Sequence, residues 1–192
     1  MTIQSVLGPA FATLGSGTRS DAGPLAIDFE ASCLPWHGRS YPIEVGIADE
    51  EGAARSWLIR PAPDWEGWTW TEEAEALHGL TRERLRDEGQ PVTLVASQLS
   101  EAIAGRSLIA DSELDSYWMR TLMAAAGFSQ TFAIEHIVNL IGQLDLRDED
   151  VRTCIELVDR QALPRHRAAA DARWLAALIG ALRRSAGDLR FL

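Results

Sequence analysis

Two carboxylates stand two residues apart within an apolar segment, at Asp28 and Glu30. Side chains alternate along a strand, so this pair would share one face while Ile27 and Phe29 face the other. A face that meets solvent is the ordinary alternative. Three more Asp-x-Glu pairs fall in a turn, in a loop or just beyond a strand, and begin at Asp49, Asp64 and Asp111.

Two further aspartates lie on the apolar faces of expected helices. Asp115 shares a helical stripe with Trp118 and Leu122, and Asp171 shares one with Leu175. Burying an isolated carboxylate costs several kcal/mol, so such groups are paired, capped or bound to metal. Capping is an alternative for Asp115, near its helix start, and explains less for Asp171.

A histidine, His166, precedes Asp171 by five residues. Within one helix, these side chains would lie about 140° apart. They can serve one site only if His166 lies in the loop before the helix, and Pro164 favours a helix start there. A solvent-exposed loop histidine is the alternative.

The composition excludes several kinds of chemistry. All 18 basic residues are arginine, which excludes a phosphate loop, a Schiff base or a general base built on lysine. Cys33 and Cys154 form no CxxC pair, which argues against a zinc site or a disulfide and favours a reducing, cytoplasmic setting. The net charge of −10 argues against a broad basic footprint on long duplex nucleic acid.

Length and patterning predict one α/β domain over 24–192, after a flexible N-terminal segment, 1–23. No apolar run reaches the length of a membrane span, so we expect no membrane association. Three strands joined in antiparallel fashion, followed by alternating helices and strands, predict a mixed sheet flanked by helices. The expected strands are 25–30, 41–48, 54–60, 107–110 and 131–134, and the expected helices are 72–77, 93–104, 114–126, 147–159 and 167–184.

The ordered set of acids and histidine resembles the DEDDh family of 3′-to-5′ exonucleases, which includes a proofreading subunit, ribonuclease T and oligoribonuclease. The resemblance covers about residues 25–182. One departure is Asp111-Ser-Glu-Leu-Asp115, where relatives often have Asn-Ala-x-Phe-Asp, so Asp111 competes with Asp115 as the third carboxylate. The segments that carry the resemblance, in family order, are DFEAS, SYPIEVGIA, LIRP, EALHGLTRERL, LIADSELDSYWM and HRAAADA.

The resemblance implies a ribonuclease H-like fold, with a mixed five-stranded sheet of three antiparallel strands followed by parallel strands. It also implies hydrolysis assisted by two Mg²⁺ or Mn²⁺ ions. Carboxylate clusters without cysteine suit such hard cations. By resemblance, Asp28, Glu30 and Asp171 bind the first ion. Asp28 bridges to the second ion, whose waters Asp115 holds. His166 would be the general base, and the product a 5′-mononucleotide.

Substrate contacts are expected at two places. The Leu-His-Gly-Leu segment resembles the family's loop over the terminal nucleotide, so His78 or Leu80 would contact the last base or sugar. Backbone at Ala31 and Ser32 would also touch substrate. Four tryptophans are either a packed lid or core, or a stacking surface for bases: Trp57, Trp65, Trp68 and Trp70.

The expected partner is the 3′ end of single-stranded or short DNA or RNA. One alternative is a module that binds nucleic-acid ends or a partner protein without cleavage. Another is a proofreading subunit active only in a polymerase complex. Relatives that trim short RNA are often dimers, so the resemblance also allows a homodimer.

Overall fold

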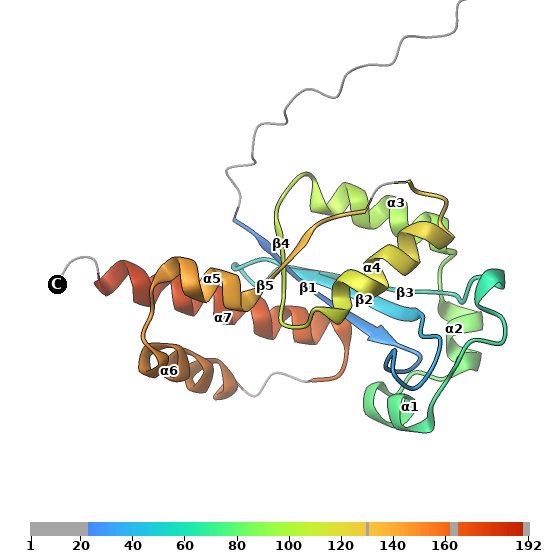
Figure 1. Cartoon of the computed structure of the whole chain (residues 1–192), viewed down its shortest axis with the longest axis horizontal. Coiled ribbons are helices and arrows are strands. Elements are labelled where there is room, and N and C mark those ends of the chain that lie inside the picture. Colours follow the sequence, from blue (N-terminus) through green and yellow to red (C-terminus); the bar gives the residue numbers. More distant parts are fainter. Residues whose placement is uncertain (1–22, 130, 162–164, 190–192) are drawn as a thin grey trace, which may run out of the picture.

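A computed structural model of the chain describes residues 23–129, 131–161 and 165–189 (Figure 1). The segment 1–22, which makes up nearly all of the predicted flexible leader, lies outside the described residues, as does Pro164. The elements in chain order are β1 Leu25–Ala31, β2 Pro42–Ala48, β3 Ala54–Leu58, η1 Pro63–Trp65, α1 Glu72–His78, α2 Arg82–Glu88, α3 Val92–Ile103, β4 Leu108–Ala110, α4 Leu114–Ala125, β5 Ile134–His136, α5 Ile137–Leu144, α6 Asp148–Asp159 and α7 Ala168–Leu189.

The five strands form one mixed sheet in the order β3-β2-β1-β4-β5. The first three strands pair antiparallel, and β4 and β5 add on parallel to β1. This arrangement confirms the predicted mixed sheet. Because β1 and β4 run parallel, their carboxyl ends meet at one edge, where Asp28, Glu30 and the turn at Asp111 come together.

Helices cover both faces of the sheet (Figure 1). Ile27 and Phe29 of β1 pack into a core that includes residues of α3 and α4. On the other face, Ala26 packs with residues of α5, α6 and α7. Side-chain alternation therefore places Asp28 and Glu30 on the α7 side of β1.

Two helices, α2 and α5, are absent from the sequence expectation, and β5 begins three residues later than predicted. Each helix has about two turns, and Leu85 is the one buried residue of α2, so each gives too short a hydrophobic pattern to identify a helix. Thr81 caps α2 by accepting a hydrogen bond from the Arg84 N–H. The β5 register is set by pairing of Ile134 with Leu108, which local sequence does not encode.

None of the helices in the described ranges combines the length and apolar character that crossing a membrane requires. Cys33 and Cys154 are both buried and both carry free thiols.

Candidate active site

Three carboxylates from two elements converge on the α7 side of β1. One oxygen from each of Asp28, Glu30 and Asp171 lies within 4.8 Å of the others. The first two come from β1 and the third from the first turn of α7. An isolated solvated strand face does not account for this arrangement, because α7 packs directly on β1.

Asp115 joins the site from the opposite side of the sheet, at the start of α4. Its Oδ1 accepts a hydrogen bond of 3.1 Å from the Phe29 N–H. Strand β4 ends at Ala110, so this carboxylate meets a β1 amide beyond the end of the parallel ladder. Its other oxygen, Oδ2, is buried without a hydrogen-bond partner among the described residues.

Asp171 holds the turn that carries His166. Its Oδ2 accepts hydrogen bonds from the backbone N–H groups of His166, at 2.7 Å, and Arg167, at 3.2 Å. His166 has φ 63°, in the left-handed region that non-glycine residues rarely adopt, and its side chain is exposed. Helix α7 begins after it, at Ala168, so His166 lies in the preceding loop.

Asp171 Oδ1 is buried and makes no hydrogen bond with the described residues, but the guanidinium of Arg165 lies against it. Arg165 also stacks over the ring of Trp174, at 4.5 Å from the ring centroid. A cation bound to Asp171 Oδ1 would therefore take the place of this guanidinium.

Glu44 is a site residue that the sequence reasoning missed. It is 1% exposed on β2, and its carboxylate accepts two hydrogen bonds from Arg167, at 2.8 and 2.9 Å. The same carboxylate accepts the N–H of Ala168 at 3.2 Å. Glu44 thus anchors the start of α7 to the sheet, beside the turn of His166. The sequence does contain a sign of this role, because Glu44 is a single acid within the apolar segment PIEVG, and a buried acid needs a partner.

Gly46 lets α7 approach the sheet closely, and it too was missed. It pairs with Asp28 across β1 and β2. A Cβ at this position would overlap the backbone carbonyl of Ala168 and would lie 2.5 Å from the nitrogen of Ala169. No side chain fits between β2 and the helix turn that presents Asp171.

Gly46→Ala is therefore expected to weaken Mn²⁺ binding by roughly 10-fold, because overpacking of 1–3 kcal/mol must displace the start of α7. Calorimetric Mn²⁺ titration measures this change. Gly142→Ala is the matched control, since a Cβ at that helical glycine meets nothing within 4 Å. Unchanged Mn²⁺ affinity in Gly46→Ala would show that the close approach does not position Asp171.

The cluster resists ionisation in the absence of a cation. Burial, followed by the charge of Asp171, raises the pKa of Glu30 to about 7. Burial, followed by the charge of Asp111, raises the pKa of Asp115 to about 8. Burial and the neighbouring carboxylates also raise the pKa of Asp28 well above its usual range. Perturbation of this kind is concentrated at functional sites.

These directions predict how stability depends on pH. Unfolded carboxyls titrate near pH 4, so between about pH 4 and 8 the folded protein binds more protons than the unfolded chain. Without divalent cations, stability should therefore fall as pH rises, with Tm dropping by roughly 5–10 °C between pH 5 and 8.5. Thermal unfolding in chelator measures this, and a Tm that rises over the same range would contradict it.

Mn²⁺ should reverse that loss, because an ion binds the ionised carboxylates and favours the folded state. Asp115→Asn should flatten the pH dependence in chelator, since it removes a group with a raised pKa. Asp87→Asn, an exposed change on α2, serves as its control and should leave the curve unaltered.

The donor set fits a hard divalent cation. All four acids offer oxygen ligands, and two of these oxygens are buried without hydrogen bonds to described residues. A bound positive charge would also relieve the mutual repulsion of the carboxylates.

Asp111, which competes with Asp115 as the third carboxylate, is exposed and does not belong to the group of three oxygens. Its charge reaches the site, since it raises the pKa values of Asp28 and Asp115.

A pocket of about 180 Å³ opens beside the acids. Two of the predicted substrate-contact residues, Ala31 and His78, line it together with Phe29 and Glu30. The His78 Nδ1 accepts the Leu80 N–H at 3.0 Å, so the ring proton belongs on Nε2, which is buried without a partner among the described residues. Burial lowers the pKa of His78 and favours its neutral form.

The other two predicted contact residues do not line this pocket. Leu80 is fully buried in the core. Ser32 is also fully buried, and its N–H and carbonyl are bonded to Tyr41 and Thr71. In their place, the rim carries exposed apolar side chains that the sequence reasoning did not select, Leu34 and Leu77.

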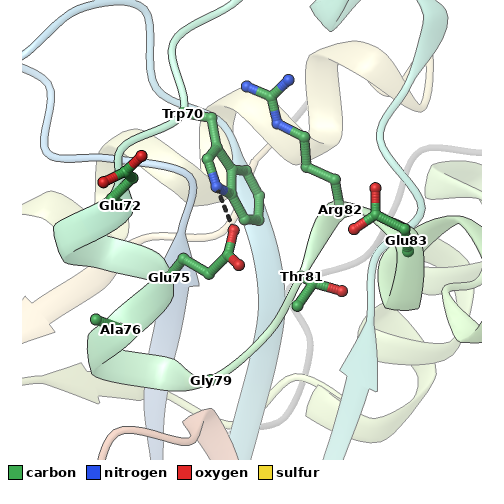
Figure 2. Close-up of a pocket in the computed structure, with 8 residues that line it drawn as sticks. All are labelled: Trp70, Glu72, Glu75, Ala76, Gly79, Thr81, Arg82 and Glu83. Carbon is green, nitrogen blue, oxygen red and sulfur yellow. Dashed lines mark hydrogen bonds between the residues drawn. The ribbon is translucent and has the colours of Figure 1, made fainter.

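The tryptophan-rich stretch is packed against the core. Trp57 and Trp65 are each 4% exposed, and Trp68 and Trp70 are partly buried against the same cluster. Trp70 also lines a wider hollow of about 650 Å³, together with Glu72, Glu75 and Ala76 of α1 and Arg82 of α2 (Figure 2). There its Nε1 donates to Glu75 at 2.7 Å, and Arg82 lies over its ring.

No family model and no curated protein matches the sequence. Among solved structures, Exonuclease I of E. coli in complex with a dA16 oligonucleotide is similar at TM-score 0.63 and 13% identity, covering 87% of this chain and 42% of that chain. A moderately thermophilic Exonuclease I from Methylocaldum szegediense is similar at TM-score 0.60 and 18% identity, with coverage of 87% and 42%. This chain therefore spans less than half the length of those Exonuclease I chains.

A third structure, of a 3′-exonuclease recognising the 3′ end of a histone mRNA stem-loop, is similar at TM-score 0.55 and 14% identity. The match covers 87% of this chain and 82% of that chain. The chain thus has the ribonuclease H-like fold of these exonucleases, the fold that its resemblance to the DEDDh family predicts.

Proposed function

We propose that the protein is a metal-dependent 3′-to-5′ exonuclease of the DEDDh type that hydrolyses single-stranded or short nucleic acid to 5′-mononucleotides. The observation that carries this proposal is the convergence of Asp28, Glu30 and Asp171 within 4.8 Å. Asp115 stands beside them with a buried, unpartnered oxygen. The similarity of fold to Exonuclease I and 3′-exonuclease structures supports the proposal.

In this proposal, Asp28, Glu30 and Asp171 hold the first Mg²⁺ or Mn²⁺ ion. Asp28 would also serve a second ion, and Asp115 would hold the waters of that ion. When bound, such ions lower the pKa of a water and stabilise the charge on the attacking and leaving oxygens. The neighbouring pocket at Ala31 and His78 would receive the terminal nucleotide, with neutral His78 able to donate through Nε2.

His166 is the proposed general base. An imidazole nitrogen takes a proton from the attacking water, whose oxygen forms a bond to phosphorus while the bond from phosphorus to the 3′ oxygen of the preceding nucleotide breaks. The leaving oxygen gains a proton from solvent, which leaves a shortened strand with a 3′ hydroxyl and a free 5′-mononucleotide. Asp171 and Glu44 hold the turn that presents this imidazole.

Strands labelled at the 5′ end test the proposal. RNA and DNA of equal sequence should give a ladder that shortens from the 3′ end with Mg²⁺ or Mn²⁺ and should stay intact with chelator. If neither strand is cut in either metal, the result would favour the alternatives, which are a binding module without activity or a subunit that needs a polymerase complex. Adding a polymerase partner and repeating the assay separates these two.

A further inference from the structure

A second groove lies between helix α4 and the segment around η1, with one residue, Arg39, from the loop after β1. It has a volume of about 480 Å³, and its walls include Arg39, Trp68, Tyr117 and Arg120. The proposed reaction makes no use of it. Its position and its charge indicate a further binding site.

Helix α4 and the loop after β1 each contribute residues to both the groove and the nucleotide pocket. Trp118 lines the pocket and its neighbour Tyr117 lines the groove. Both are bonded to one residue of the loop: Trp118 Nε1 donates to Ser40 Oγ at 2.9 Å, and Tyr117 Oη donates to the Ser40 carbonyl at 3.2 Å. The same loop lines the pocket with His37.

The loop that contributes to both hollows also carries an exposed aromatic ring. Trp36 is 67% exposed, and its ring meets the ring of His37 edge-on at 5.9 Å. A large apolar ring this open gains by stacking on a nucleobase. The loop therefore combines a residue of the pocket, His37, an exposed ring able to stack, Trp36, and a residue of the groove, Arg39.

Two free arginines give the groove a positive wall in a protein of net charge −10. Arg39 and Arg120 are exposed, and neither forms an ion pair with a carboxylate in the described part of the chain. The Arg39 guanidinium is held 4.2 Å over the ring of Trp68, which orients its N–H edge. The acid among the lining residues is Asp64, which is exposed.

The length of the groove suits several nucleotides. The α4 residues that line the groove extend from Tyr117 to Ala125, a length of about 12 Å at a rise of about 1.5 Å per residue. This lining begins near the end of α4 that bears Asp115 and leads away from it. A stacked strand rises about 3.4 Å per nucleotide, so the groove holds roughly three or four. We infer that this groove binds the phosphodiester backbone of a single strand upstream of its 3′-terminal nucleotide; this inference rests on the proposed function.

The test measures binding and cleavage of single strands of 2, 4, 8 and 16 nucleotides. Arg120→Gln should weaken binding of the two longer strands by about threefold to fivefold, the worth of one exposed ion contact, and should leave the dinucleotide unchanged. Its KM for long strands should rise with kcat constant. The slope of log Kd against log salt should fall by about 0.7.

Asp64→Asn should act in the opposite direction and tighten binding of long strands, because it removes the negative charge from the groove. Arg39→Gln should resemble Arg120→Gln. The matched control is Arg152→Gln, an exposed arginine on α6 at a distance from α4 (Figure 1), which should change nothing. All these side chains are exposed, so the variants should fold.

Binding measured by fluorescence anisotropy in chelator separates this inference from the proposed activity. If the wild type cleaves but Arg120→Gln affects all lengths equally or none, the groove assignment is overturned while the activity stands. If long strands bind through Arg120 yet no strand is cleaved in Mg²⁺ or Mn²⁺, the groove assignment stands and the activity fails. If the wild type neither binds nor cleaves any strand, both are overturned.

Discussion

Replacing Asp28 with asparagine should reduce kcat by at least about 1,000-fold, since two bound metal ions supply several kcal/mol of transition-state stabilisation. Asp28 is the acid expected to touch both ions, so its loss should disrupt both positions. Its pKa is raised by burial and by Asp115 and Glu30, which places it at the centre of the cluster. The measurement is single-turnover cleavage of a 5′-labelled strand at saturating Mn²⁺.

The fold should survive this change. Asparagine has the same shape and removes one of several repelling charges, so Tm in chelator should stay equal or rise, while the increase in Tm caused by Mn²⁺ should shrink. Asp87→Asn on α2 is the control and should keep full activity. Full activity in Asp28→Asn would remove the acid cluster from the reaction.

His166→Ala should reduce kcat by roughly 100- to 10,000-fold, the usual contribution of a positioned general base. Mn²⁺ affinity should not change, because the bond that orients the turn runs from the backbone N–H of residue 166 to Asp171 and does not involve the imidazole. Single-turnover kinetics and a Mn²⁺ titration test the two halves of this prediction separately.

Added imidazole distinguishes a chemical role from a structural one. The His166 side chain is exposed, so free imidazole can reach the position it vacates and should restore part of the lost rate. His136→Ala is the control: His136 caps α5 through Val138, so its loss should cost about 1 kcal/mol of stability without slowing cleavage. Unchanged turnover in His166→Ala would exclude this histidine as the base.

The sequence carried enough information to predict most of the sheet. The apolar β1 with its alternating acids, the turn at Asp49-Glu50-Glu51-Gly52 and the parallel addition of β4 all follow from local patterns. The turn forms as expected, with the Gly52 N–H donating to the Asp49 carbonyl at 3.0 Å. Helices α2 and α5 were not predicted from the sequence, because short helices depend on caps and tertiary packing more than on hydrophobic periodicity.

The residues that hold the site together were harder to find than the acids. Glu44 stands directly opposite Glu30 in the register of β1 and β2, a placement that sequence alone does not reveal. Gly46 is informative only once α7 is known to cross β2 at that point. Of the predicted contact residues, Ala31 and His78 line the pocket, whereas Ser32 and Leu80 are buried. Ser32 follows the irregularity of β1 at Glu30 and Ala31, where strand alternation no longer predicts which way a residue faces. Leu80 follows α1, and its burial in the core depends on tertiary packing.

If the acid cluster hydrolyses nucleic acid from a free 3′ end, a strand without ends should resist the protein. The most direct test compares a linear single strand with a covalently closed circle of the same sequence, in Mn²⁺, for the wild type and Asp28→Asn. We expect the wild type to shorten the linear strand from its 3′ end and to leave the circle intact, and we expect Asp28→Asn to cut neither. Cleavage of the circle, or loss of the linear strand to Asp28→Asn at the wild-type rate, would contradict this expectation.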